Sequence, residues 1–236
     1  MADATPSLVL LAELGMPGQR IELDHDPAHY VVHVCRARPG DTFWATDGAG
    51  HLAHLRLVTV APSVTAEVES RVRQPRKREC VVWCGAPEGT RADWLVEKLA
   101  ELGVGTMQPV DCARSKWEAR PSRMARWSRL AGSALRQSRS VYLMRIEPPR
   151  RLTELLESIP PGASLWFADP DGLKRVSPPE ETMSIGMIGP AEGVDDRERG
   201  LLEARGFKPI SLGESRLRSE TAAMAWAAWW ASGADG

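Results

Sequence analysis

The chain has 236 residues, of which 43% are hydrophobic and 26% charged, and its formal net charge is -1 at pH 7. These values are typical of a globular protein with one large or two modest domains, and they exclude a surface that is basic all over. Any nucleic-acid surface must therefore be local.

No apolar run is long enough to span a membrane, and residues 1–6 lack the basic start and apolar core of a signal peptide. The four cysteines are too few and too spread for a disulfide scaffold. We therefore expect a cytoplasmic protein with reduced thiols and no membrane partner.

The N-terminal part reads as a small, mostly β module that ends near residue 72. Asp26-Pro27 is a helix start, and Asp47-Gly48 is a hairpin turn between alternating segments. We expect one short helix and three strands, at residues 27–36, 42–46, 51–60 and 64–72.

All five histidines lie between His25 and His54. Imidazole is a common metal ligand, but no carboxylate or cysteine stands at ligand spacing beside them. We expect surface or helix-packing histidines and no metal site.

Five basic residues surround Gln74-Pro75, between two strand-like segments. Charge runs are usually solvated linkers, but these residues, Arg76 among them, could instead contact phosphates between two domains.

The stronger basic signal follows at residues 114–139, where eight cations accompany a single acid, Glu118. If residues 121–139 form a helix with Trp127 on its buried side, arginines line the rest of it, as expected for binding a phosphate backbone.

Residues 73–236 alternate strand and helix patterns, which predicts a largely parallel α/β sheet. Thr90 and Asp93 form an N-cap pair, and Gly103 stands where a helix ends. Six strands are expected, at residues 80–85, 106–110, 142–146, 164–168, 185–189 and 208–212. Helices are expected to start near residues 90, 121, 152, 195 and 219.

Two of these strands run into glycine loops. Residues 189–193 read Gly-Pro-Ala-Glu-Gly, and a capping box formed by Asp195 and Glu198 follows. Residues 213–218 make the second turn, and Asp169-Pro170-Asp171-Gly172 is expected to be a loop after a third strand. Since parallel strands end at one sheet edge, where ligands bind, these loops together predict a site.

At this point the sequence resembles a known family, the bacterial small-subunit ribosomal RNA uridine N3-methyltransferases of the SPOUT superfamily. Residues 212–222 read Leu-Gly-Glu-Ser-Arg-Leu-Arg-Ser-Glu-Thr-Ala, close to the family's Leu-Gly-x-Arg-Ile-Leu-Arg-x-Glu-Thr-Ala. Residues 189–193 depart from the family's Gly-Pro-Glu-Gly-Gly, with Ala191 for the glutamate and Glu192 for a glycine.

Two further blocks carry the resemblance. The family's Lys-x-x-Glu-Leu-Gly and Pro-x-x-x-x-Arg-Ser patterns match at Lys98, Glu101, Leu102, Gly103, Pro109, Arg114 and Ser115. The family's N-terminal PUA-like domain is matched at His29, Val34, Arg36, Gly40, Asp41, Asp47 and Gly48.

The resemblance implies a PUA-like β-barrel RNA-binding domain at residues 1–72 and a SPOUT methyltransferase domain, with a C-terminal trefoil knot, at residues 73–236. It implies a homodimer that needs no metal and methylates N3 of one uridine in 16S ribosomal RNA, free or in the small ribosomal subunit. The methyl donor is S-adenosylmethionine, held by Ala168, Ile188, Gly189, Pro190, Gly193, Leu212, Gly213 and Leu217. The RNA-binding candidates are Arg36, Arg76, Arg114, Arg123, Arg126 and Arg139.

Methylating N3 requires loss of the uridine N–H proton, which a nearby cation favours. We expect Arg218 to be that cation and Glu220 to orient it, although a purely structural Arg218–Glu220 salt bridge is nearly as plausible from sequence. Other readings stay open: a SPOUT enzyme acting on another RNA position, a non-catalytic RNA-binding relative, or a nucleotide-binding enzyme unrelated to RNA.

Overall fold

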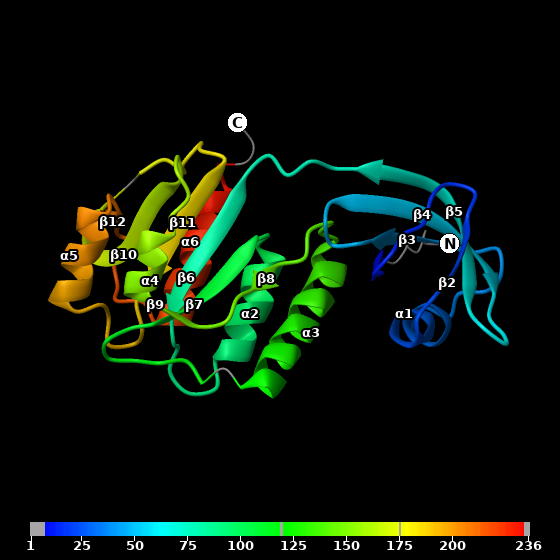
Figure 1. Ribbon diagram of the computed structural model, residues 1–236, viewed down its shortest axis with the longest axis horizontal. Coiled ribbons are helices and arrows are strands. Elements are labelled where there is room, and N and C mark those ends of the chain that lie inside the picture. The colour runs from blue at the N-terminus through cyan, green and yellow to red at the C-terminus, as the bar shows by residue number, and fades with distance from the viewer. Residues whose placement is uncertain (1–7, 119, 175, 234–236) are drawn as a thin grey trace. The chain divides into compact units, whose positions relative to one another are not determined.

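The computed structural model describes residues 8–118, 120–174 and 176–233 (Figure 1). Residues 1–6, on which the expectation of no signal peptide was based, lie outside the described part. The chain divides into two compact units. The first contains the residues up to Arg76 together with Leu135–Leu143, and the second contains Lys77–Ala134 and the residues from Met144 onward.

The first unit is built on a five-stranded sheet with the order β1-β3-β4-β5-β2. These strands are β1 (Leu8–Leu10), β2 (Arg20–Glu22), β3 (Thr42–Thr46), β4 (His51–Thr59) and β5 (Thr65–Arg73). The three longer strands and their antiparallel pairing confirm the predicted hairpin pattern. The two short strands were missed because three residues are too few for an alternation to show.

The hairpin turn between β3 and β4 forms for the expected reason. Gly48 has a φ of 72°, which glycine adopts without strain, and the Asp47 carboxylate accepts the Ala49 N–H at 2.8 Å. The expected helix at residues 27–36 is present as α1 (His25–His29) and a π-helical turn, η1 (Tyr30–Val34). The expected start at Asp26-Pro27 was wrong, because α1 begins at His25 with Asp24 as its N-cap residue.

One later segment also belongs to the first unit. Residues 135–143, which begin in the second half of helix α3 (Pro121–Ser138), pack within the first unit. The Val141 carbonyl accepts the Thr46 hydroxyl at 3.1 Å, and the Arg136 guanidinium lies 5.0 Å from the Tyr30 ring centre. No pattern in the sequence predicted that the chain returns to the first unit.

The second unit is a parallel α/β sheet with the strand order β12-β10-β11-β6-β7-β8, and β9 also pairs with β7. All of its strand pairs are parallel, which confirms the predicted fold class. The strands are β6 (Glu79–Gly85), β7 (Thr106–Asp111), β8 (Arg145–Ile146), β9 (Arg150–Arg151), β10 (Ser164–Leu173), β11 (Met183–Ile188) and β12 (Lys208–Ile210).

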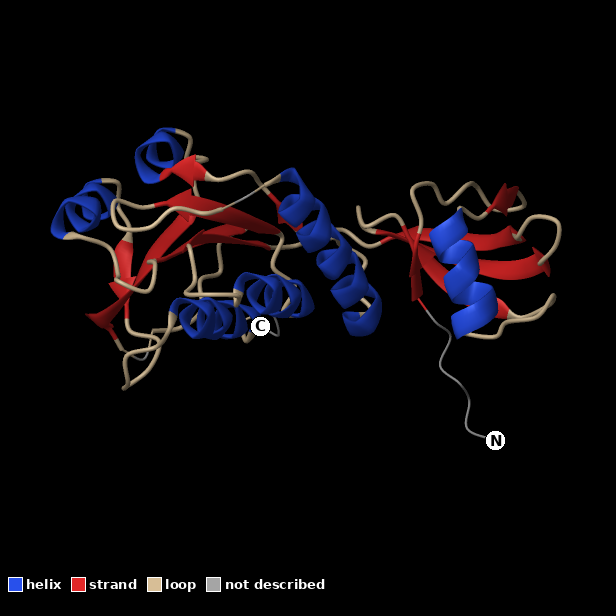
Figure 2. Cartoon of the chain, turned by 90° about the horizontal axis from the view of Figure 1, so that it is seen from below, coloured by secondary structure: helices blue, strands red, loops and turns tan. Residues whose placement is uncertain are grey.

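Both faces of this sheet are covered by helices (Figure 2). Besides α3, these are α2 (Ala92–Glu101), α4 (Leu152–Glu157), α5 (Asp196–Ala204) and α6 (Ser219–Ala231). Because strand side chains alternate, Val81 and Ile185 face the core under α4 and α5, while Gly186 faces α6. Burial on both faces explains why the strands read as continuous apolar runs.

Of the two helix caps predicted in this unit, one is correct and one is wrong. The capping box of α5 is confirmed, since Asp195 Oδ1 accepts the Glu198 N–H at 2.7 Å and Glu198 Oε2 accepts the Asp195 N–H at 3.1 Å. The Thr90–Asp93 cap of α2 is wrong. The N-cap of α2 is Arg91, with no side-chain cap.

The Asp93 carboxylate is instead engaged by helix α3. It accepts the Trp127 indole N–H at 2.9 Å and forms an ion pair with Arg126 Nε at 2.6 Å. A charged partner and a buried indole donor outweigh the local cap.

Two other predictions about strands were wrong. The segment expected to be a loop from Asp169 to Gly172 is part of β10, which continues to Leu173 and pairs again with Ile210 after an irregularity. The strand expected at residues 142–146 is reduced to Arg145–Ile146, because residues up to Leu143 pack in the first unit.

The contact between α6 and the sheet is unusually close at one glycine. A Cβ atom on Gly186 of β11 would lie 2.1 Å from the ring of Trp226, whose side chain is fully buried. Glycine at this position lets the helix lie directly on the strand. No other residue fits there unless the helix moves.

We predict that Gly186→Ala lowers stability by about 1–3 kcal/mol, because the added methyl group overpacks against Trp226. Gly200→Ala is the matched control, since Gly200 is exposed on α5 with no atom within 4 Å of an added Cβ. That change should instead stabilise by about 0.4–1 kcal/mol. Urea unfolding followed by tryptophan fluorescence measures both, and equal shifts of the same sign would contradict this packing.

Candidate functional site

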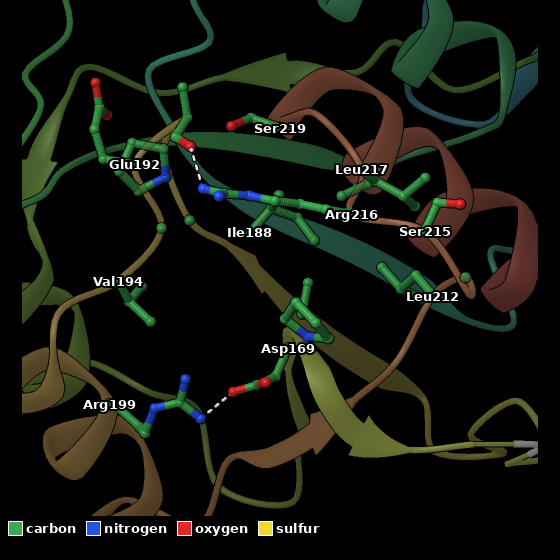
Figure 3. A pocket seen from close by; sticks show the side chains of 18 residues that line it. Asp169, Ile188, Glu192, Val194, Arg199, Leu212, Ser215, Arg216, Leu217 and Ser219 are labelled. Carbon is green, nitrogen blue, oxygen red and sulfur yellow. Dashed lines mark hydrogen bonds and ion pairs between the residues drawn. The ribbon is translucent and has the colours of Figure 1, made fainter.

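A pocket of about 330 Å³ lies where β10, β11 and β12 end (Figure 3). Its volume falls in the range of about 300–1,000 Å³ usual for ligand sites. The eight residues expected to hold a cofactor all line it: Ala168, Ile188, Gly189, Pro190, Gly193, Leu212, Gly213 and Leu217. The two glycine loops therefore meet residues 168–170 of β10 at one edge of the sheet.

The first loop, residues 189–193, is a tight turn against the end of β6. The Gly193 N–H donates to the Pro190 carbonyl at 2.8 Å, and a Cβ on Gly85 would lie 2.4 Å from the Pro190 nitrogen. The left-handed φ of 76° falls on Gly193 and not on Glu192. The turn therefore accepts glutamate at position 192, where the resembling family has glycine.

The second loop is tied to the first by an arginine. Arg216 Nη2 donates to the Ala191 carbonyl at 3.2 Å, so the guanidinium spans the pocket mouth between the two loops (Figure 3). Within the second loop, the Ser211 hydroxyl donates to the Gly213 carbonyl at 3.1 Å. Leu212 and Leu217 add apolar surface to the wall.

A buried acid of β10, Asp169, was not among the eight residues expected to hold the donor, although its segment was expected at the site. Asp169 is 4% exposed, lines the pocket and forms an ion pair with Arg199 of α5, as Figure 3 shows. Its other oxygen accepts the Asp171 N–H at 2.9 Å. Asp169 follows a predicted strand, which is a usable signal, but nothing local in the sequence points to Arg199.

The expected pairing of Arg218 with Glu220 is wrong. Glu220, 3% exposed, forms its ion pair with Arg91 Nε at 3.1 Å. Arg218 is the N-cap of α6, and its Nη1 lies 3.8 Å from Glu88 Oε2. Both of these side chains are largely exposed, so this contact holds Arg218 only loosely. Arg218 stands between two pocket residues, Leu217 and Ser219.

The six candidate RNA-binding arginines divide between the two units. In the first unit, the Arg76 guanidinium lies 4.2 Å from the Tyr142 ring centre. Arg36 and Arg139, also in the first unit, adopt left-handed φ values of 56° and 57°. Residues other than glycine rarely adopt this region. Both residues follow a helix end, Arg36 after η1 and Arg139 after α3.

In the second unit, Arg114, Arg123 and Arg126 are all exposed but are not equally available. Arg126 is held by Asp93 at 2.6 Å, and Arg123 lies 3.8 Å from the exposed carboxylate of Glu118. Arg114 has no ion pair within the part of the chain that the structure describes. Arg114 is therefore the most available of the three.

Other chemistry is limited in the described residues. They contain no group of three or more His, Cys, Asp or Glu side chains placed to hold a metal ion, and no helix among them is long and apolar enough to cross a membrane. Burial raises the pKa of the Cys84 thiol, and burial together with nearby Glu198 raises that of Cys112 to about 12. Both thiols stay protonated near neutral pH and are poor nucleophiles.

Comparison with known proteins places this geometry in a family. A family model described as an RNA methyltransferase domain matches residues 74–231, and one described as an RNA methyltransferase PUA domain matches residues 23–69.

Two curated relatives are both named ribosomal RNA small subunit methyltransferase E. The one from Synechocystis sp. is 26% identical over 205 residues, which cover 82% of this chain and 67% of the relative. The one from Aquifex aeolicus is 34% identical over 135 residues, which cover 56% of this chain and 58% of the relative.

A solved structure extends the likeness to three dimensions. It is a ribosomal RNA small subunit methyltransferase E from Neisseria gonorrhoeae bound to S-adenosyl methionine, with a TM-score of 0.85 and 26% identity. The match covers 94% of this chain and 95% of that one. Since the methyltransferase model alone spans most of the sequence, the chain belongs to the RNA methyltransferase family that this model describes.

Proposed function

We propose that this protein transfers a methyl group from S-adenosylmethionine to N3 of a specific uridine in 16S ribosomal RNA. The observation that carries the proposal is the meeting of two glycine loops and strand β10 around one pocket, lined by all eight residues expected to hold the donor. The names of the relatives and of the donor-bound neighbour support the substrate class and the donor.

The pocket suits a donor held by backbone groups. Gly189 and Gly213 bring main chain to the pocket wall without side chains, and an added Cβ on Gly189 would lie 3.0 Å from the Val194 nitrogen. Backbone N–H and C=O groups can then reach a polar ligand directly. When bound, S-adenosylmethionine supplies an electrophilic methyl group on a sulfonium ion.

The protein must hold the uridine nitrogen in line with that methyl group, and positioning of this kind contributes several kcal/mol to rate acceleration. Arg218 stands at the edge of the pocket with most of its side chain exposed, so an incoming base can reach it. We assign Arg218 the role of stabilising the uridine anion that forms as the N3 proton leaves.

In this proposal Glu220 acts indirectly, through another arginine. Its buried carboxylate forms an ion pair with Arg91, the N-cap residue of α2. Arg91 and Arg218 lie 3.6 and 3.8 Å from the same oxygen of Glu88, so Glu220 holds a second cation near Arg218. Glu220 is therefore a positioning residue rather than a partner of Arg218.

The RNA backbone is proposed to contact the arginines named above: Arg36, Arg76, Arg114, Arg123, Arg126 and Arg139. Helix α3 supports this role, because most of its exposed charged side chains are arginines. We further propose an RNA-binding domain at residues 1–72 and a methyltransferase domain at residues 73–236, in line with the two matched ranges, with residues 135–143 of the second domain packed in the first unit.

The proposal includes a cytoplasmic homodimer with a C-terminal trefoil knot, acting on free RNA or on the small ribosomal subunit. The Trp94 side chain on α2 is 45% exposed, and large aromatic rings are enriched at protein interfaces, which supports self-association.

We expect titration of the protein with S-adenosylmethionine to give heat of binding at a single class of site. In a strain lacking the gene, mass mapping of 16S ribosomal RNA should show one uridine without its N3 methyl group, and complementation should restore it. Absence of binding heat would indicate a non-catalytic relative. A restored modification on another base or in another RNA would refute the substrate.

Arg218→Ala should reduce methyl transfer by about 10²-fold or more, the usual loss when one group that stabilises a developing anion is removed. Binding of S-adenosylmethionine and the circular dichroism spectrum should stay unchanged, because Arg218 is exposed and only loosely held. Arg218→Lys keeps the charge and should retain part of the activity. Near-normal turnover of Arg218→Ala would rule out this role.

Arg114→Gln should weaken RNA binding and reduce the slope of log affinity against log salt by about 0.7, the value for one phosphate contact on single-stranded nucleic acid. Arg205→Gln is the control, because Arg205 is an exposed arginine outside the expected RNA-binding set. Fluorescence anisotropy at several salt concentrations measures both variants. Identical slopes for the two would count against Arg114 as a contact.

A further inference from the structure

The hydroxyl of Ser219 is buried without a partner at the donor pocket. The residue is 5% exposed, and its Oγ atom has no hydrogen-bond partner among the residues that the structure describes. Ser219 lines the pocket, together with Ile188 and Arg216 (Figure 3). A buried polar group normally finds a partner, so this hydroxyl points to a ligand.

Ser219 is also the first residue of a long helix whose N-terminus lacks a side-chain cap. Helix α6 has 13 residues, and its N-cap residue, Arg218, makes no side-chain cap hydrogen bond. The first N–H groups of such a helix carry partial positive charge and favour an anion. The hydroxyl and the helix start therefore offer donors to the same ligand group.

The charges around the pocket favour a carboxylate as that group. Arg216 spans the mouth with one nitrogen on the Ala191 carbonyl, and its guanidinium has further donors. The buried acid of the pocket, Asp169, is already matched by Arg199. The other acid that lines the pocket, Glu192, has no ion pair within the described residues, but it is exposed, so solvent screens its charge. An added negative charge near Ser219 thus meets a cation and a helix N-terminus, and the buried acid nearby is already neutralised.

We propose that Ser219 is a donor-binding residue whose hydroxyl donates a hydrogen bond to the carboxylate of the amino-acid tail of S-adenosylmethionine. The inference rests on the proposed function, since it presumes that this donor occupies the pocket. It goes beyond the motif resemblance, because position 219 is a variable position in the family pattern. The helix start and Arg216 complete the carboxylate site.

A matched pair of variants tests this role. Ser184 of β11 is also fully buried, with an Oγ atom that lacks a partner among the described residues, but it does not line the pocket. Both Ser219→Ala and Ser184→Ala should raise the Tm of the donor-free protein by a few degrees, because each removes a buried unsatisfied hydroxyl. Only Ser219→Ala should raise the Kd for S-adenosylmethionine, by about tenfold or more.

A tail-free analogue identifies the bonded group. 5′-Methylthioadenosine lacks the amino-acid tail, so its Kd should be the same for the wild-type protein and for Ser219→Ala. An equal loss for this analogue would move the bond to the nucleoside and overturn the assignment. Ser219→Thr keeps the hydroxyl and should bind S-adenosylmethionine within a few-fold of wild type.

The failure of this inference differs from that of the proposed function. If the wild-type protein binds S-adenosylmethionine and Ser219→Ala binds it equally well, the role of Ser219 is refuted while the donor assignment stands. If the wild-type protein does not bind the donor, the proposed function fails, and this inference fails with it.

Discussion

The packing of Trp226 on Gly186 fixes where the last helix meets the sheet, and the pocket depends on it. From Trp226 back to Ser219 the helix rises about 10 Å, at 1.5 Å per residue. From Gly186 forward to Gly189 the strand and its end also advance about 10 Å, at 3.3 Å per residue. The helix start therefore arrives at the edge where the first glycine loop turns, and both line the pocket.

The pocket wall could be predicted from sequence because its parts are local. Each loop follows an apolar strand, and parallel strands end at one edge, so Gly189 and Gly213 had to lie near each other. The ion pairs could not be predicted in this way. Glu220 pairs with Arg91 and Asp93 with Arg126, and each contact joins two elements distant in sequence, so it depends on packing that no local pattern encodes. Likewise, the unsatisfied hydroxyl of Ser219 is recognised only once its surroundings are known.

The fold shows why counting arginines is a poor guide to a nucleic-acid surface. The net charge is -1 although basic residues crowd residues 114–139. Acids from other elements engage several arginines: Asp93 holds Arg126 and Asp169 holds Arg199. Arginines that have no acidic partner keep the positive electrostatic potential that attracts a phosphate backbone. The electrostatic surface is therefore set by tertiary pairing as much as by composition.

The return of residues 135–143 to the N-terminal unit changes how the two units are connected. The chain passes between them after Arg76, after Ala134 and after Leu143, so they share three covalent crossings instead of one linker. A single proteolytic nick would leave them joined. A fragment cut near residue 76 would lose the Val141 carbonyl that satisfies Thr46, a fully buried residue. The N-terminal unit is thus an interlaced part of the polypeptide and not a module that can be exchanged by cutting once.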